Sequence, residues 1–354
     1  MSDVREVLDA EHHARAQAAP QVQADAAVHI RLAEPGDADG LAHCFYRAYG
    51  DSYDHAWVYR PDALRRRWAD RLTVSVVGLS PEGDVIGHIA ADFEHPTARV
   101  GESGQAVVDP RYRGHHLFES MKRFLSDWAH QDGLYGLFSE ATAVHPYSQR
   151  GNLALGAHEM GFLIGYIPSG VDYVAITDSA SVHRATAALM YLRSNEEPER
   201  MVHVPAAYRD IAMRIYDEAG LRRVAGAGEG SGPVPGSELH VWRDPAHNAV
   251  QLHCKDAGSD IHQMVTQHLE AFRAQGVDCV YLDLPLADPD VFVHAAELDG
   301  LGFAFSCILP EIRPDGDVLR LQHLNGVDPC IDDIATASDF GRALLGEIAA
   351  GLAA

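Results

Sequence analysis

The spacing of apolar residues alternates between strand-like and helix-like from residue 28 onward. Short runs rich in Val, Ile and Leu, bounded by Gly, Pro or Asp, indicate strands, whereas apolar residues three or four positions apart indicate helices. In the helix expected over 37–49, Leu41, Cys44 and Phe45 share one face. The first half therefore predicts strands at 28–32, 73–79, 85–93, one ending at 108, 136–144 and 161–166, with helices at 37–49, 61–71, 117–131 and 147–159.

The second half repeats the later part of this order. Strands are expected at 202–204, 239–242, 249–254, 277–284, 303–309 and 318–324, and helices at 205–219, 261–274 and 288–301. Gly302-Phe303 takes the place that Gly161-Phe162 has in the first half. The repeat predicts a mixed α/β (α+β) protein of two tandem domains, each a central mixed β-sheet flanked by helices; an unrelated α/β domain is the alternative for the second half.

The domain boundaries follow from shifts in composition. A chain of 354 residues favours two domains. The segments before, between and after them lack a sustained apolar face, apart from one C-terminal helical stripe that includes Phe340, Leu344 and Ile348. The expected division is an N-terminal arm (1–27, helical or disordered), a first domain (28–178), a linker (179–200), a second domain (201–328) and a C-terminal helix (329–354).

Charge and cysteine content narrow the class of partner. The net charge of −23 repels nucleic acid and anionic membranes, so neither is an expected partner. No apolar run reaches the ~20 residues of a membrane span, and the N-terminus lacks the layout of a signal peptide, so we expect a cytoplasmic protein. The five cysteines have no CxxC spacing and therefore predict reduced thiols and no metal site.

One motif carries candidate chemistry. A strand ending at Val108 leads through Asp109-Pro-Arg-Tyr-Arg-Gly114 into the helix expected from Leu117. The first N–H groups of a helix have no partner within the helix and, with the helix dipole, favour an anion. Arg111, Arg113 and Lys122 place positive charge near this point of an acidic chain. The segment predicts a phosphate-binding turn, with an ordinary strand-turn-helix junction as the alternative.

This motif and the element order over 28–177 resemble the GNAT (GCN5-related N-acetyltransferase) superfamily. Its pyrophosphate-binding pattern is Arg or Gln, two residues, Gly, one residue, then Gly or Ala. Arg113 fits the pattern, whereas His116 and Phe118 stand where small residues are usual. The second half has no such turn at 254–260 and is expected to be degenerate. The resemblance implies acetyl-CoA as the acyl donor, bound at Val107, Val108, Arg111, Arg113, Gly114, His115, His116, Leu117 and Phe118.

The resemblance also implies direct attack of an amine on the thioester. Glu140, Glu102 and His145 are the candidates for the general base, and Glu140 stands out because its strand is otherwise apolar or small; a paired structural carboxylate is the alternative. The usual acid, a tyrosine four residues before Gly161, is replaced by Ala157, which leaves Tyr147 as a substitute. A backbone N–H on the strand before the turn, where Val107 and Val108 run alongside the acyl chain, is expected to stabilise the oxyanion; core packing is the other role for these valines.

These residues predict an acyl-CoA-dependent N-acyltransferase that acetylates the amine of a small molecule. Two alternatives stay open. The loss of the tyrosine at position 157 is compatible with a non-catalytic acyl-CoA-binding or protein-interaction module. Some tandem proteins that resemble this one are aminoacyl-tRNA-dependent transferases, although the net charge argues against a nucleic-acid partner. The apolar stripe of the C-terminal helix allows a homodimer.

Overall fold

The chain divides into two compact units, residues 1–137 and 138–354. The expected N-terminal arm, Gly114 and His115 lie outside the described residues. The computed structural model describes residues 28–51, 53, 55–113, 116–169, 183–226, 236–298 and 300–353.

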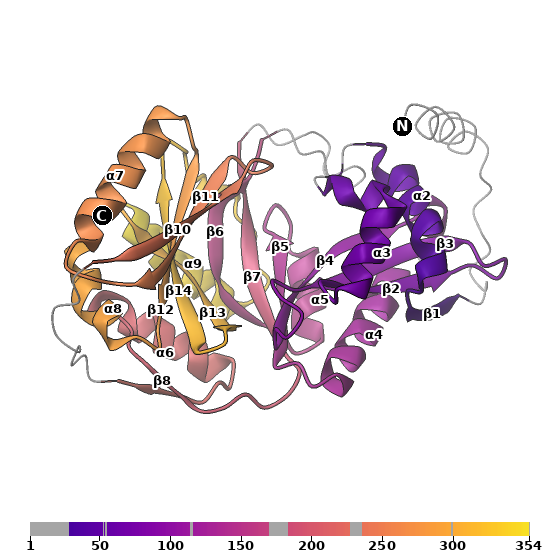
Figure 1. Ribbon diagram of the computed structural model, residues 1–354, viewed down its shortest axis with the longest axis horizontal. Coiled ribbons are helices and arrows are strands. Elements are labelled where there is room, and N and C mark those ends of the chain that lie inside the picture. The colour runs from indigo at the N-terminus through magenta and orange to yellow at the C-terminus, as the bar shows by residue number, and fades with distance from the viewer. Residues whose placement is uncertain are drawn as a thin grey trace. The chain divides into compact units, whose positions relative to one another are not determined.

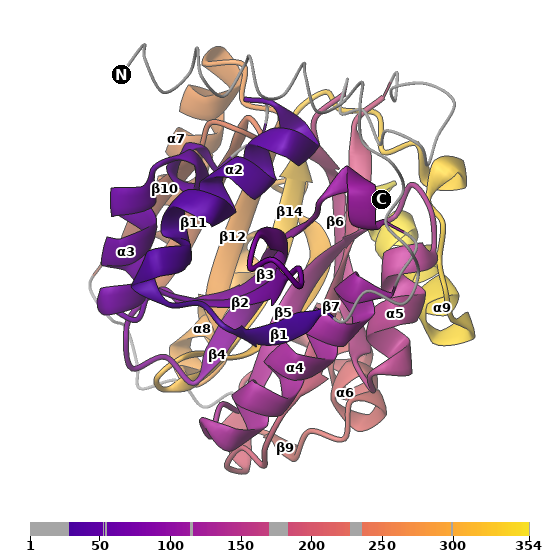
Figure 2. The same cartoon turned by 90° about the vertical axis from the view of Figure 1, so that its right-hand side faces the viewer.

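Unit 1 is an antiparallel sheet with helices on both faces. Its strands follow the chain in the order β1-β2-β3-β4. α2 and α3 pack on one face of the sheet and α4 packs on the other (Figure 2). The elements are β1 (His29–Leu32), α2 (Ala38–Tyr49), α3 (Pro61–Ala69), β2 (Thr73–Leu79), β3 (Val85–Asp92), β4 (Val100–Val108) and α4 (Leu117–Gln131), with short 3-10 turns η1 (Pro35–Asp37), η2 (Ala56–Tyr59) and η3 (Pro110–Tyr112).

Two apolar clusters hold these layers together. Alternate residues of a strand point to opposite faces, so Val77 contributes to the cluster under α2 and its neighbour Val76 to the cluster under α4. On α4, Leu117, Met121 and Leu125 recur every four residues and are all buried against the sheet. The sequence pattern predicted α4 and β2 with the bounds that the structure has, and both predictions are confirmed.

Unit 2 contains the rest of the chain (Figure 1). Its main sheet has the strand order β5-β7-β6-β13-β14-β12-β11-β10, and β8 and β9 form a separate parallel pair. α9 packs on β6 and β13. The elements are β5 (Gly136–Thr142, which begins just before the division), α5 (Tyr147–Ala154), β6 (His158–Ile167), β7 (Ala185–Arg193), β8 (Arg200–Val202), η4 (Ala206–Tyr208), α6 (Arg209–Glu218), β9 (Arg223–Ala225), β10 (Glu238–Asp244), β11 (Ala249–Asp256), α7 (Ile261–Ala274), β12 (Cys279–Pro285), α8 (Pro289–His294), η5 (Ala295–Leu298), β13 (Ala304–Arg313), β14 (Gly316–Leu324), η6 (Ile331–Asp333) and α9 (Asp339–Leu352).

A strand order occurs twice in this sheet. β5-β7-β6 and β12-β14-β13 both insert the last strand of three between the two that precede it in the chain. The two copies meet where Gly161 of β6 pairs with Cys307 of β13. A Cβ at Gly161 would lie 2.0 Å from the carbonyl oxygen of Ser306, so only glycine fits this close approach. The repeated order is a feature of unit 2, and two tandem domains stay a prediction.

Two expectations about element positions are wrong. The segment 179–200 was expected to be a linker, but Ala185–Arg193 form β7, a strand that is buried along nearly its whole length. The helix expected over 147–159 ends at Ala154, because Gly156 takes a left-handed backbone with φ +87° and β6 begins at His158. The division between the compact units also falls at 137/138 rather than near residue 178.

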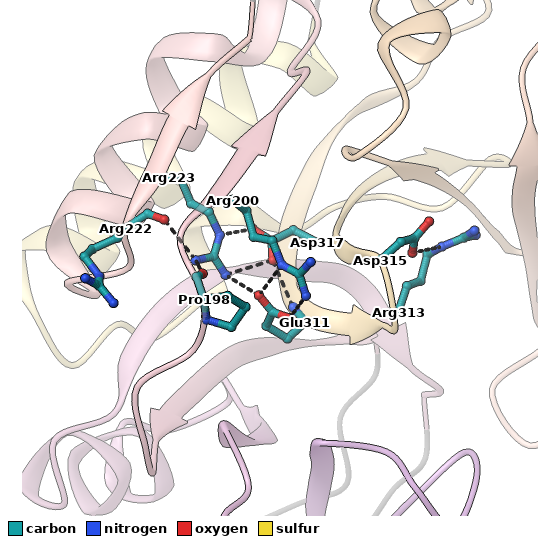
Figure 3. Close-up of polar contacts among 8 residues, drawn as sticks. All are labelled: Pro198, Arg200, Arg222, Arg223, Glu311, Arg313, Asp315 and Asp317. Carbon is teal, nitrogen blue, oxygen red and sulfur yellow. Dashed lines mark hydrogen bonds and ion pairs between the residues drawn. The ribbon is translucent and has the colours of Figure 1, made fainter.

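A buried ion cluster fastens β9 to the β13–β14 hairpin of unit 2 (Figure 3). The Arg223 guanidinium is inaccessible to solvent and donates to Asp317 at 2.6 and 3.0 Å and to Glu311 at 3.1 Å. Arg200 on β8 donates to both carboxylate oxygens of Glu311 at 3.0 and 2.7 Å. Two cations thus balance two buried carboxylates, and the loss of one cation would leave uncompensated buried charge.

We expect Arg223→Met to lower the free energy of unfolding by about 3–5 kcal/mol, since it leaves Asp317 and Glu311 buried with one cation. Arg342→Met is the matched control, because Arg342 pairs with Asp339 at the surface, where an ion pair contributes about 0–1 kcal/mol. Urea denaturation of the two variants measures both values. Equal, small losses would contradict an energetic role for the cluster.

Candidate functional site

The candidate site is built on the junction between β4 and α4 in unit 1. β4 ends at Val108, and the turn η3 follows at once, with the Asp109 carboxylate capping it by accepting the backbone N–H of Arg111 at 3.0 Å. Val107 packs in the cluster under α2, and Val108 packs against the cluster under α4. Both side chains therefore serve the core, and their backbone groups stay the predicted contacts for an acyl donor.

Asp109 is the electrostatic centre of this junction. Its carboxylate is almost wholly buried and accepts from Arg111 Nε and Nη2 at 2.9 and 2.7 Å and from Arg47 Nε at 2.6 Å. Burial opposes ionisation, but the two guanidinium groups and the backbone N–H prevail and hold the pKa of Asp109 below its usual value. Arg47 also donates to the Val85 carbonyl at 2.7 Å, so this carboxylate joins α2, β3 and the turn.

The positive charge expected near the turn is smaller than the sequence indicated. Arg111 is committed to Asp109. Lys122 is buried, and burial lowers the pKa of its ammonium group to about 8. Of the three cations, Arg113 alone is exposed, so it is the residue of this group that is best placed to meet an anionic ligand.

The start of α4 explains the two unusual residues of the motif. His116 has a left-handed backbone with φ +55°, a conformation that glycine adopts without strain, and its exposed ring lies 3.1 Å from Glu119. Phe118 packs against the apolar cluster under α4, so its side chain is accommodated by the core. Leu117 is buried in the same cluster. Gly114 and His115 lie outside the described residues.

A β-bulge lies in β4, shortly before the turn that begins at Asp109. His88 of β3 pairs with Val107 and Ala90 pairs with Gly104, so Ile89 faces two residues of β4, Gln105 and Ala106. Gln105 has a left-handed backbone with φ +47°. The bulge was not predicted; the sequence signal for it is Gly104 beside Gln105, since a glycine within a strand often marks a bulge.

His88 lies beneath this bulge. Its ring is fully buried, and Nδ1 lies 2.7 Å from the Gln105 carbonyl oxygen. Burial lowers the pKa of His88 to about 4, although the hydrogen bond to Gln105 acts in the opposite direction. His88 is thus a neutral ring at physiological pH, and sequence reasoning did not single it out.

The candidate general bases are found in different surroundings. Glu102 is exposed on β4, opposite Asp92 of β3. Glu140 on β5 belongs to unit 2 and is exposed to solvent, although its strand neighbours Ser139 and Ala141 are buried. Desolvation raises the pKa of Glu140 to about 7; the positive charge of Arg320 opposes this shift and the negative charge of Asp244 adds to it. Such a pKa suits a group that must accept a proton near neutral pH.

The candidate proton donor Tyr147 and the position that lacks a tyrosine, Ala157, lie near opposite ends of α5. Tyr147 begins α5 and is exposed, with its ring centroid 5.0 Å from that of His145. Burial lowers the pKa of His145. Ala157 is buried just before β6, so the position expected to carry a tyrosine holds only a methyl group in the core. The roles expected for Tyr147 and Glu102 stay predictions.

The described residues contain neither a metal-binding group nor a membrane-spanning helix. In the described part of the chain, no group of three His, Cys, Asp or Glu side chains is placed to hold a metal ion. No helix among the described residues is both long and apolar enough to cross a membrane. All five cysteines are free thiols; four are buried and Cys330 is partly accessible.

Comparison with known proteins gives one family match. Residues 40–162 match the profile of the Acetyltransferase (GNAT) family. No curated protein sequence matches the chain. Similar solved structures include the ribosomal-protein-S5-alanine acetyltransferase from Vibrio fischeri (16% identity, 51% of this chain and 100% of that one, TM-score 0.38), the putative acetyltransferase yncA from Salmonella typhimurium with acetyl-CoA (17%, 49% and 96%, 0.38) and the spermidine/spermine N-acetyltransferase SpeG from Vibrio cholerae (14%, 47% and 94%, 0.38).

Because His88 is buried and neutral, we expect the free energy of unfolding to depend on pH. Because its pKa is about 4 in the folded protein and about 6.5 when unfolded, the unfolded chain binds the extra proton first and stability falls as the pH drops through this range. Between pH 7.5 and pH 5, the wild type should lose about 2 kcal/mol more unfolding free energy than His88→Asn. Urea denaturation at both pH values measures the difference, and parallel losses would contradict it.

Proposed function

We propose that this chain, whose residues 40–162 match the acetyltransferase (GNAT) family, transfers an acetyl group from acetyl-CoA to the amine of a small molecule. The observation that carries the proposal is the β4–α4 junction within the matched segment. There, a strand end, a turn fixed by Asp109 and the exposed Arg113 precede the start of a fifteen-residue helix.

The junction suits the donor that the family uses. The N–H groups at the start of α4 and the charge of Arg113 provide favourable contacts for a pyrophosphate. The left-handed backbone of His116 supplies the conformation for which the family pattern uses a small residue, so the substitution to histidine keeps the shape of the turn. β4 provides a backbone N–H group for the acyl oxygen, and Val108 is the better placed of the two predicted residues, because successive N–H groups of a strand point to opposite edges and Val107 pairs with His88 of β3.

The chemistry requires one proton acceptor. In the proposed step the amine nitrogen bonds to the thioester carbonyl carbon, the carbon–sulfur bond breaks, and coenzyme A leaves as a thiolate. Glu140 takes the proton that the amine loses, and its raised pKa makes it a competent base near pH 7. With alanine at position 157, the exposed Tyr147 at the start of α5 is the proposed donor of the proton that converts the thiolate to the thiol.

The C-terminal repeat is not proposed as a second donor site. β11 and β12 run parallel and are joined by α7, but the segment 254–260 between β11 and α7 carries no arginine-glycine turn. The Cys254 carbonyl there accepts a hydrogen bond from Arg313 Nη1 at 3.3 Å, so a side chain of the protein uses a backbone group at this strand end. One donor per chain is therefore expected.

Calorimetric titration tests the donor claim. Acetyl-CoA should bind the wild type, and Arg113→Glu should weaken binding at least ~tenfold, because it opposes the pyrophosphate with a negative charge. Arg66→Glu makes the same charge change at an exposed position of α3 and serves as the control. No binding to the wild type would sink the donor claim; binding without thiol release across a panel of primary amines would favour a binding module, and tRNA binding at low salt would favour the aminoacyl-tRNA alternative.

The pH dependence of acetyl transfer tests the base. We expect kcat/KM to rise with pH through about 7, because only the ionised form of Glu140 accepts the proton. Glu140→Gln should lower kcat by about 10²–10⁴-fold and remove this limb of the profile. Glu102→Gln should retain the limb; its loss in the Glu102 variant and survival in the Glu140 variant would transfer the role to Glu102.

A further inference from the structure

A chain of three buried or half-buried polar groups ends on the bulge of β4. Trp68 Nε1 donates to Ser75 Oγ at 2.9 Å, Ser75 Oγ lies 2.8 Å from His88 Nε2, and His88 Nδ1 lies 2.7 Å from the Gln105 carbonyl oxygen. All of these residues belong to unit 1, and they connect α3, β2, β3 and β4.

Only one arrangement of hydrogens satisfies this chain when His88 is neutral. A carbonyl oxygen can only accept, so the Gln105 oxygen requires a hydrogen on His88 Nδ1. The neutral ring then has a bare Nε2, which accepts the hydrogen of Ser75 Oγ, while Ser75 Oγ accepts the indole N–H of Trp68. The Gln105 carbonyl therefore selects the tautomer, and Ser75 is compatible with it.

The bulge that His88 contacts has two features that fold stability does not explain. Gln105 holds a left-handed backbone that strains a residue with a side chain. Its side-chain oxygen, Oε1, is buried and has no hydrogen-bond partner among the described residues. Backbone strain and unsatisfied buried polar atoms are costly in free energy and collect at binding sites, and this pair lies two residues before the predicted donor contacts Val107 and Val108.

We propose that His88 is a positioning residue for acyl transfer, which fixes the β4 bulge, and with it the backbone N–H groups that receive the acyl oxygen, through a single locked tautomer. This inference rests on the proposed function, because it assumes that the donor lies along β4. His88 does not touch the donor; it acts through the Gln105 carbonyl. The hydrogen bond removes the freedom of the bulge to rotate its peptide groups, so the donors are oriented before the ligand arrives.

A matched pair of variants isolates this hydrogen bond. Asparagine places its amide nitrogen where His88 has Nδ1 and can still donate to the Gln105 carbonyl, whereas leucine has a similar size and no donor. Acetyl-CoA and free coenzyme A are titrated separately into the wild type, His88→Asn and His88→Leu. The two ligands share every contact except those of the acetyl group, so their affinity ratio reports on the acyl oxygen alone.

His88→Leu should weaken acetyl-CoA binding by about five- to tenfold, the loss of one hydrogen bond, and coenzyme A binding by less than about twofold. His88→Asn should restore the acetyl-CoA affinity to within about twofold of the wild type. Equal weakening of both ligands in His88→Leu would overturn the inference while leaving the donor claim intact. Failure of the wild type to bind either ligand would overturn the proposed function itself, and this inference with it.

Ser75→Ala keeps His88 in place and tests the chain if the leucine variant does not fold. In the wild type, the nitrogen NMR shifts of His88 should report a protonated Nδ1 and a bare Nε2 that do not change between pH 5.5 and pH 8. Ser75→Ala removes the hydroxyl beside Nε2 but not the Gln105 carbonyl, so Nδ1 should stay protonated and the preference for acetyl-CoA over coenzyme A should stay within about twofold of the wild type. A wild-type ring protonated at Nε2, or a lost ligand preference in Ser75→Ala with Nδ1 still protonated, would refute the hydrogen bond from Nδ1 to Gln105 as the positioning device.

Discussion

The buried carboxylate of Asp109 is the constraint on which the candidate site depends. An isolated charge in this position would be strongly unfavourable, so the fold brings it two guanidinium groups, one from α2 and one from the turn that it caps. Each partner is then held as firmly as the carboxylate: Arg47 also binds β3, and Arg111 fixes the course of the chain toward α4. The end of β4 and the start of the helix are thus set by one electrostatic requirement.

Strain is concentrated at the same place. Gln105 and His116, two of the six described non-glycine residues with a left-handed backbone, flank the segment that runs from the bulge to the helix. Each of them costs free energy that the flanking sheet and helix must supply through packing, and the two apolar clusters of unit 1 do so from opposite faces. A rigid, double-faced sheet is therefore what allows an irregular strand end and turn to persist between regular elements.

The sequence pattern was most informative where one periodicity dominated. α4, α7 and β2 were predicted with the bounds observed, because each has a clean apolar face and ends at a glycine, proline or polar residue. β7 was missed because its run of Ala, Leu and Met is buried on both sides and shows no alternation. The pairing of Arg47 with Asp109 joins residues 62 positions apart, so no local pattern could indicate it. The sequence analysis assigned Arg111 to a ligand, whereas its guanidinium group pairs with Asp109.

The repeat has a consequence for the chemistry of the first half. Glu140 lies on β5, a strand of the first repeat, yet the two charges that modify its pKa belong to β10 and β14 of the second repeat. Asp244 also accepts hydrogen bonds from Tyr166 of β6 and lies 2.7 Å from His247, while Arg320 is held by Asp283. Neither charge can move far without leaving a buried partner unpaired. Segment 254–260 of the second repeat carries no arginine-glycine turn, but this repeat supplies fixed charge to Glu140, the proposed base.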